Sequence, residues 1–124
     1  MSLAIRKKGQ NTADQRWHDA NDLRWAVRHW AVRINVKTPQ IHLREMTNKW
    51  ASISTKGRLT LDTGLLQIPR RLGEFVIVHE LVHLIAPNHG KVFKSFLTAY
   101  LPDWENLQKE LQTYARKTTT SRRP

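Results

Sequence analysis

The spacing of apolar residues first predicts a long helix. Between residues 12 and 34 they recur at intervals of three and four, as on a helix that buries one face, and they are Leu23, Ala26, Val27, Trp30, Ala31 and Ile34. Thr12 with Gln15 three residues later fits a capping box at the start of this helix. Asn35 suits a left-handed stop, and Pro39 prevents any continuation.

The next part of the chain has an alternating pattern, which is typical of β-strands. Ile41 and Leu43 alternate with His42 and Arg44, so residues 41–45 predict a short strand. Residues 50–55 and 58–62 predict two more strands, separated by a Lys-Gly turn. We therefore expect residues 48–62 to form a hairpin.

Three further helices are predicted in the second half of the chain. One begins near Pro69 and ends at Pro87, and because its apolar residues cover more than one stripe, we expect it to be central and covered on most sides. Residues 91–101 and 104–114 predict two amphipathic helices, which Pro102 separates. An N-terminal helix, a small three-stranded, largely antiparallel sheet and these helices together indicate an α+β fold.

The predicted central helix carries the most specific chemical motif, His79-Glu80-Leu81-Val82-His83. Residues four apart on a helix share a face, so both imidazoles can reach one metal ion. Glu80 lies beside the first histidine, where it can hold and deprotonate a metal-bound water. His89 follows a helix break, so the chain can turn back and bring a third nitrogen to the ion. Three protein nitrogens and a water form an open tetrahedral site, the pattern of catalytic zinc.

A competing interpretation makes His79 and His83 ordinary core histidines and Glu80 an accidental neighbour. A buried, ionised glutamate between two histidines is costly unless a charge compensates it, and a metal ion removes that cost. We therefore predict one zinc ion on His79, His83 and His89, with Glu80 as the general base. Imidazole ligands also accept cobalt, nickel and copper. A zinc hydroxide can attack phosphorus as well as an amide, so the motif alone leaves the substrate open.

The composition limits the kind of protein that contains this site. A chain of 124 residues allows one domain, or one domain with tails. Cysteine is absent, which excludes disulfides, thiolate zinc sites and cysteine nucleophiles. No apolar run approaches the roughly 20 residues that a membrane span needs, and the first residues lack the pattern of a signal peptide. We expect a cytoplasmic protein with no membrane partner.

The net charge of +11 is concentrated near the two ends of the chain. Residues 9–115 contain 14 lysines and arginines together with all ten acidic residues, so most of the excess lies outside them. We expect a basic N-terminal tail over residues 1–11, one domain over 12–115 and a disordered basic tail over 116–124. Such tails are either simply solvated or make non-specific contact with nucleic acid.

Other residues are weaker candidates for function. Trp50 and residues 52–55 could form an edge strand that pairs with an extended peptide beside the metal, although Trp50 also suits a core or rim position. Several arginines could bind a carboxylate or phosphate but also fit ordinary surface charge, namely Arg58, Arg70 and Arg71. Tyr100 lies in an apolar stripe and receives no role. Three histidines lie outside the motif: His18, His29 and His42.

Four segments together resemble the YgjP-like metallopeptidases, which are minimal zincins related to the WLM and SprT-like proteases. They are residues 49–61, residues 76–84, Asn88-His89-Gly90 with Phe93, and residues 101–104. The combination is more specific than His-Glu-x-x-His alone. The resemblance implies zinc bound by the three histidines, Glu80 as general base, and a small antiparallel sheet beside the active-site helix.

The sequence thus predicts a zinc-dependent hydrolase that cleaves peptide bonds in a protein or peptide substrate. One alternative is a WLM/SprT-like protease that acts on DNA-associated proteins, with affinity supplied by the basic tails. A second alternative is hydrolysis of a nucleotide phosphoanhydride by the same zinc-activated water. A third is a metal-stabilised binding module without catalysis, in which Glu80 is dispensable. The oligomeric state is not predicted.

Overall fold

A computed structural model describes the backbone of residues 15–122 and the side chains of residues 15–114. The N-terminal tail predicted over residues 1–11, and Thr12 of the predicted capping box, lie outside these residues. The elements in chain order are α2 (Ala20–Ile34), β1 (Gln40–Arg44), β2 (Ala51–Ile53), β3 (Arg58–Asp62), the 3-10 helix η1 (Thr63–Gln67), α3 (Arg70–Val82), α4 (Lys91–Tyr100) and α5 (Trp104–Arg122). This order confirms the α+β fold.

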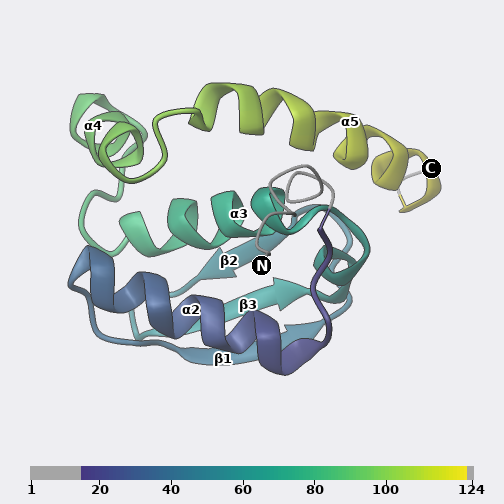
Figure 1. Ribbon diagram of the computed structural model, residues 1–124, viewed down its shortest axis with the longest axis horizontal. Helices are drawn as coiled ribbons and strands as arrows, with labels where there is room; N and C mark the ends of the chain where they lie inside the picture. The colour runs from purple at the N-terminus through teal and green to yellow at the C-terminus, as the bar shows by residue number, and fades with distance from the viewer. Residues whose placement is uncertain (1–14, 123–124) are drawn as a thin grey trace, which may run out of the picture.

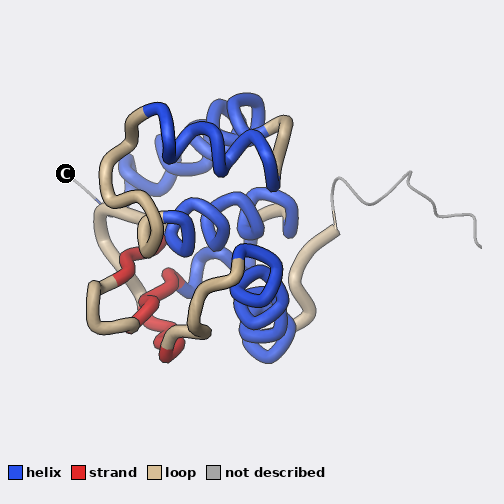
Figure 2. The backbone as a smooth tube through the Cα atoms, turned by 90° about the vertical axis from the view of Figure 1, so that its left-hand side faces the viewer, coloured by secondary structure: helices blue, strands red, loops and turns tan. Residues whose placement is uncertain are grey.

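Helix α3 occupies the middle of the molecule. The sheet and α2 lie on one side of it and α4 and α5 on the other (Figures 1 and 2). Its buried side chains point in several directions, as the predicted central helix requires, and they are Leu72, Phe75, Val76, Ile77, Val78, Leu81 and Val82. No helix in the described part of the chain is long and apolar enough to cross a membrane.

Helix α2 begins later than the sequence predicted. Its N-cap is Asp19, whose side chain accepts a hydrogen bond from the backbone N–H of Asp22 at 3.0 Å. The Asp22 carboxylate in turn accepts the N–H of His18, so two free donors at the start of the helix are satisfied close to the apolar stripe. Gln15 lies before the helix, where its carbonyl accepts the N–H of Arg70, so the predicted capping role of Gln15 was wrong.

The C-terminal end of α2 agrees with the prediction. Asn35 adopts a left-handed conformation with φ of 67°, and its N–H bonds back to Ala31 and Val32. Asparagine tolerates this conformation better than most residues. The whole predicted apolar stripe of this helix is buried, which anchors α2 against α3.

The sheet is mixed rather than largely antiparallel. Strands β2 and β3 form the predicted hairpin, with Ala51 opposite Leu61. Strand β1 instead pairs with β3 in parallel, with Ile41 beside Leu59, so the strand order is β1-β3-β2. The apolar residues of all three strands share the face that packs toward the helices. The hairpin's edge strand, β2, is the strand nearest to α3.

The loop between β1 and β2 explains the parallel pairing. It crosses the end of β3, where the Asp62 carboxylate accepts the N–H of Met46 at 2.9 Å and the N–H of Asp62 bonds to the carbonyl of Trp50 at 2.8 Å. β1 and β2 lie on either side of β3, and a loop this short returns the chain in the opposite direction, so β1 and β2 run antiparallel to each other. Because β1 is antiparallel to β2, it is parallel to β3. Asp62 is fully buried at this crossing.

The last two helices agree with the prediction at their starts. α4 begins at Lys91 and α5 at Trp104, on either side of Pro102. Phe93, Leu97, Leu107 and Leu111 bury their side chains in the core. α5 continues through Arg122. The basic tail over residues 116–124 stays a prediction.

Candidate metal centre

His79 and His83 lie on one face of the last turns of α3. Their ring centroids are 5.0 Å apart, as expected for residues separated by one helical turn. The regular helix ends at Val82 rather than near Pro87, because the following N–H groups bond to the third preceding carbonyl. His83 nevertheless keeps helical dihedral angles (φ −60°, ψ −22°), so the spacing of the two histidines is preserved.

His89 comes from the connection between α3 and α4. The chain reverses through Pro87, and the Nε2 atom of His89 lies 2.9 Å from the Nε2 atom of His83. One ligand atom from each of the three histidines falls within 4.8 Å of the others. Two nitrogens bound to one tetrahedral zinc lie about 3.3 Å apart. Among the residues that the structure describes, this is the group that could hold a metal ion, and it matches the predicted triad.

Phe93 on α4 packs against all three histidine rings. Its ring centroid is 5.0 Å from His79, 4.7 Å from His83 and 4.8 Å from His89. Phe93 is itself buried, so it limits the orientations that the imidazoles can adopt. From the sequence, Phe93 was part of the family resemblance beside Asn88-His89-Gly90 but received no role at the metal. Its spacing four residues after His89 was the available signal.

Hydrogen bonds at the other ring nitrogens leave Nε2 available for a metal. The Nδ1 atom of His83 lies 3.1 Å from the carbonyl oxygen of Pro87, which makes Nδ1 the donor. The Nδ1 atom of His79 lies 3.2 Å from a carboxylate oxygen of Glu80. Contacts of this kind set the tautomer of a metal-binding histidine. Three converging imidazole nitrogens suit zinc or another late first-row metal.

The pKa of His83 is lowered from its ordinary value of 6.5. Burial is the largest cause, because it disfavours the charged ring, and nearby His79 and His89 act in the same direction. The negative charge of Glu80 and the bond to Pro87 oppose the shift. The ring is therefore neutral near pH 7, which is the form that binds metal.

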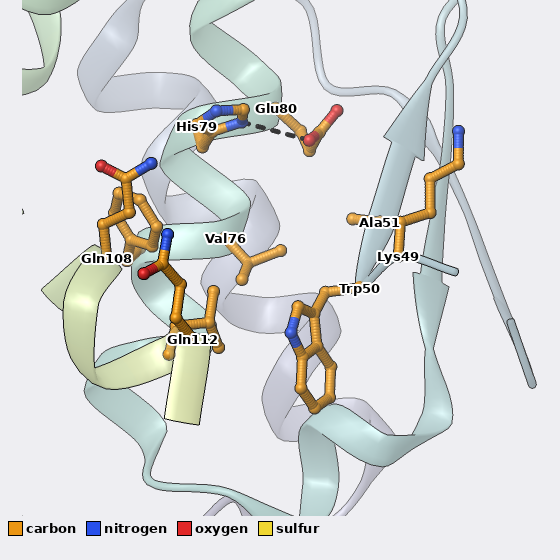
Figure 3. Close-up of a pocket in the computed structure, with 10 residues that line it drawn as sticks. Lys49, Trp50, Ala51, Val76, His79, Glu80, Gln108 and Gln112 are labelled. Carbon is orange, nitrogen blue, oxygen red and sulfur yellow. Dashed lines mark hydrogen bonds and ion pairs between the residues drawn. The ribbon is translucent and has the colours of Figure 1, made fainter. Parts of the chain in front are cut away.

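Glu80 points from α3 into the space between this helix and β2. Figure 3 shows its carboxylate directed toward the strand side of the helix. Its side chain is 14% exposed. A cleft of about 500 Å³ next to it is bounded by β2 on one side and the three histidines on the other. Glu80 and the histidine cluster thus open onto the same cleft.

A second, apolar pocket of about 250 Å³ lies on the other side of Glu80. Trp50, Val76 and Leu111 form much of its wall, and Gln108 and Gln112 project toward it from α5 (Figure 3). Lys49 and Ala51 line both spaces. The two pockets therefore flank the carboxylate along the direction of β2.

The weaker candidates lie apart from the cluster. Tyr100 packs on Phe96 and Trp30 and lines neither pocket. Arg70 forms ion pairs with Asp22 and Glu74, so it has a structural partner. The remaining arginines and histidines considered from the sequence line neither pocket: Arg58, Arg71, His18, His29 and His42. Trp50, by contrast, is half-buried in the wall of the apolar pocket.

The family described as YgjP-like, metallopeptidase domain, matches residues 5–114 of the chain. The chain belongs to this family. It is a metallopeptidase, and the earlier resemblance is confirmed. The match also covers both pocket walls and the complete histidine cluster.

Two solved structures share the fold of this metallopeptidase. One is the metallopeptidase zymogen jannalysin of Methanocaldococcus jannaschii, 23% identical, with a TM-score of 0.68 over 74% of this chain and 95% of that chain. The other is the metallopeptidase zymogen abylysin of Pyrococcus abyssi, 21% identical, with a TM-score of 0.68 over 74% of this chain and 93% of that chain. A comparison with curated proteins found no match.

Proposed function

We propose that this metallopeptidase holds one zinc ion on His79, His83 and His89 and uses Glu80 as the general base. The observation that carries this proposal is the convergence of three ring nitrogens within 4.8 Å beside a carboxylate that faces the same cleft. The donor set fits zinc, because the hydrogen bond to Pro87 leaves the Nε2 lone pair of His83 free. Three protein ligands also leave a position for water, as in catalytic sites.

Each protein group has a distinct task in this proposal. When bound, zinc would lower the pKa of a water molecule toward 7 and polarise the carbonyl under attack. Glu80 accepts the proton of the attacking water and delivers it to the leaving amine. The contact with His79 holds the Glu80 side chain near the cluster before the reaction. Phe93 keeps the three rings in place.

The substrate in this proposal is an extended stretch of protein or peptide. β2 is an edge strand, and its outer edge borders the cleft, so main-chain groups of a substrate can pair with it. A side chain beside the scissile bond can enter the apolar pocket between Trp50 and Leu111. We also place the enzyme in the cytoplasm, which its cysteine-free sequence favours.

Two variants of the purified protein test the site. Glu80→Gln should keep about one zinc per chain and lose peptide hydrolysis by a factor of about 100 or more, because the metal ligands remain and the base is removed. His89→Ala should lose most of its zinc together with its activity. Zinc content is measured by elemental analysis and hydrolysis with a panel of unfolded proteins.

His42→Ala is the matched control, since His42 is an exposed histidine outside the cluster. It should retain both zinc and activity. Undiminished hydrolysis by Glu80→Gln would remove Glu80 from the mechanism. Full zinc binding by His89→Ala would remove His89 from the ligand set. Nucleotides in the same panel test the phosphoanhydride alternative, which requires turnover of a nucleotide and not of any polypeptide.

A further inference from the structure

One stretch of the folded chain is basic and contains no acidic residue. Residues 23–44, which form most of α2 and all of β1, contain five lysines and arginines and no aspartate or glutamate. Arg28, Arg33, Lys37 and Arg44 are exposed. Arg24 is half-buried and donates to the carbonyl of Ile41 at 3.3 Å, which ties α2 to β1. The positive charge therefore belongs to the folded domain and not only to the chain ends.

The same surface carries exposed aromatic rings. Trp25 is 52% exposed, and its ring stacks on His29 with centroids 5.0 Å apart and planes 15° from parallel. Val32, two turns further along, is 76% exposed. Trp25, Arg28, His29 and Val32 follow the spacing of a single helix face, opposite the buried stripe of α2. We call these four residues, together with Arg24 and Arg33, the α2 outer face.

Contacts within the described chain engage only the inner side of the α2 outer face. His29 meets the edge of Trp30 with ring centroids 5.7 Å apart, and the Arg33 guanidinium lies 4.7 Å over the Trp30 ring. The Trp25 indole forms its ring contact with His29, which is exposed as well, so neither ring is enclosed by the fold. The ion pairs among the described residues involve Arg70, Arg71 and His79 but none of the α2 outer face. Flat rings interleaved with unneutralised guanidinium groups match the surface that single-stranded nucleic acids bind.

We propose that the α2 outer face binds single-stranded nucleic acid, with a base stacked on Trp25 and the backbone phosphates near Arg28 and Arg33. Charge complementarity favours a polyanion, since residues 23–44 contain no carboxylate and Asp22, one turn before Trp25, is paired with Arg70. An anionic membrane fits less well, because Trp25 and Val32 alone offer too little apolar area to enter a bilayer. Stacking on a base requires only one exposed ring.

This binding site is separate from the proposed catalytic cleft. None of the residues that line the two pockets belongs to α2 or β1. In Figure 1, α2 lies in front of the sheet, whereas the cleft lies between α3 and β2. A nucleic acid on α2 therefore leaves the cleft free for a polypeptide. The proposal does not depend on the identity of the metal or on the role of Glu80.

Binding of the full chain to a fluorescein-labelled oligothymidylate, followed by anisotropy, tests the proposal. Trp25→Ala should weaken binding about tenfold, because stacking on one base is lost. Arg28→Gln should reduce the slope of log K against log salt by about 0.7, the value for one phosphate contact on a single strand. Lys109→Gln is the matched control, since Lys109 is an exposed lysine on α5 and its removal should change neither quantity measurably.

Three outcomes would overturn the proposal. In one, Arg28→Gln and Lys109→Gln lower affinity equally and Trp25→Ala leaves it unchanged, which indicates diffuse charge attraction. In the second, deletion of residues 1–8 and 116–124 abolishes binding that Trp25→Ala does not affect, which assigns it to the chain ends. In the third, phosphatidylserine vesicles bind through Trp25 and the oligothymidylate does not bind. Thermal unfolding of each variant verifies that it is folded.

Discussion

At the scale of single residues, the histidine cluster depends on hydrogen bonds that a motif does not display. The spacing of His79 and His83 follows from helix geometry, so their common face could be predicted from the sequence. The carbonyl of Pro87 and the ring of Phe93 reach the cluster only after the chain reverses. Their contributions to tautomer and ring orientation could not be predicted, because they depend on the path between α3 and α4.

The lowered pKa of His83 predicts how the metal-free protein responds to acid. Because the folded-state pKa lies below 6.5, the unfolded chain binds a proton first as the pH falls. The contribution of His83 to stability is therefore present above pH 6.5 and is lost as the pH falls through the folded pKa. Urea unfolding of the chelator-treated protein should show this loss. His83→Gln should remove that part of the pH dependence, and an unchanged profile would contradict the assignment.

Gly73 permits a close approach that a larger residue would prevent. A Cβ atom at this position of α3 would lie 2.6 Å from the Nε1 atom of Trp17, whose ring is buried against the helix. Gly73→Ala should lower the free energy of unfolding by about 1 kcal/mol, since the steric cost of overpacking exceeds the gain in helix propensity. Chemical denaturation measures this change.

The double variant separates the steric effect from the helix effect. With Trp17→Leu in place, the space over Gly73 is larger, so the Gly73→Ala substitution should become stabilising. A destabilisation of the same size in both backgrounds would show that the contact with Trp17 is not its cause.

At the scale of elements, residues close together in sequence were sufficient to predict most helices and strands, but not how every strand pairs in the sheet. The β2–β3 hairpin and the left-handed end of α2 at Asn35 were predicted, because each depends on residues adjacent in sequence. The start of α2 was misassigned, since two capping patterns compete there and only Asp19 with Asp22 lies beside the packed stripe. The parallel pairing of β1 depends on the buried carboxylate of Asp62 at the loop crossing, and nothing in the sequence marks it as buried.

An ion pair between Arg71 and Glu110 joins α3 to α5. Arg71 donates two hydrogen bonds to the Glu110 carboxylate, at 2.5 and 2.6 Å, and this lowers the pKa of Glu110 below 4.5 while burial opposes the shift. Glu110→Gln should therefore reduce stability at neutral pH by less than about 1 kcal/mol, because both side chains are partly solvated. Urea denaturation measures the difference.

At acid pH, the difference in stability between the parent and Glu110→Gln should disappear. A carboxylate with a lowered pKa contributes stability above its unfolded value, and the contribution is lost as the pH falls through the folded pKa. The parent and Glu110→Gln should therefore converge below pH 4.5. Glu45→Gln, an exposed carboxylate outside α5, is the control. A gap that persists in acid would mean that Glu110 acts through packing.

At the scale of the whole molecule, a bound metal would connect parts that no disulfide can join. The chain has no cysteine, and the proposed ligands come from α3 and from the segment that leads into α4. At a thousandfold excess over its dissociation constant, a ligand specific for the folded state adds about 4 kcal/mol. Removing zinc should therefore lower the melting temperature by roughly 10–20 °C, and added zinc should restore it.

His89→Ala serves as the control for this measurement. Its melting temperature should no longer respond to zinc, whereas that of His42→Ala should respond as the parent does. Equal responses of all three proteins would place the stabilising metal elsewhere. Scanning calorimetry of the full chain gives the three values under one condition.

The open edge of β2 has a consequence for solubility. An exposed strand edge that can pair with a polypeptide substrate can also pair with the same strand of another copy. This pairing is the usual first step of aggregation through sheet edges. Here the strand is only three residues long, and the exposed amines of Lys49 and Lys56 stand just before and after it. Two such edges brought together would place like charges side by side, so the short length and the flanking lysines protect the free enzyme from self-assembly while the edge remains accessible.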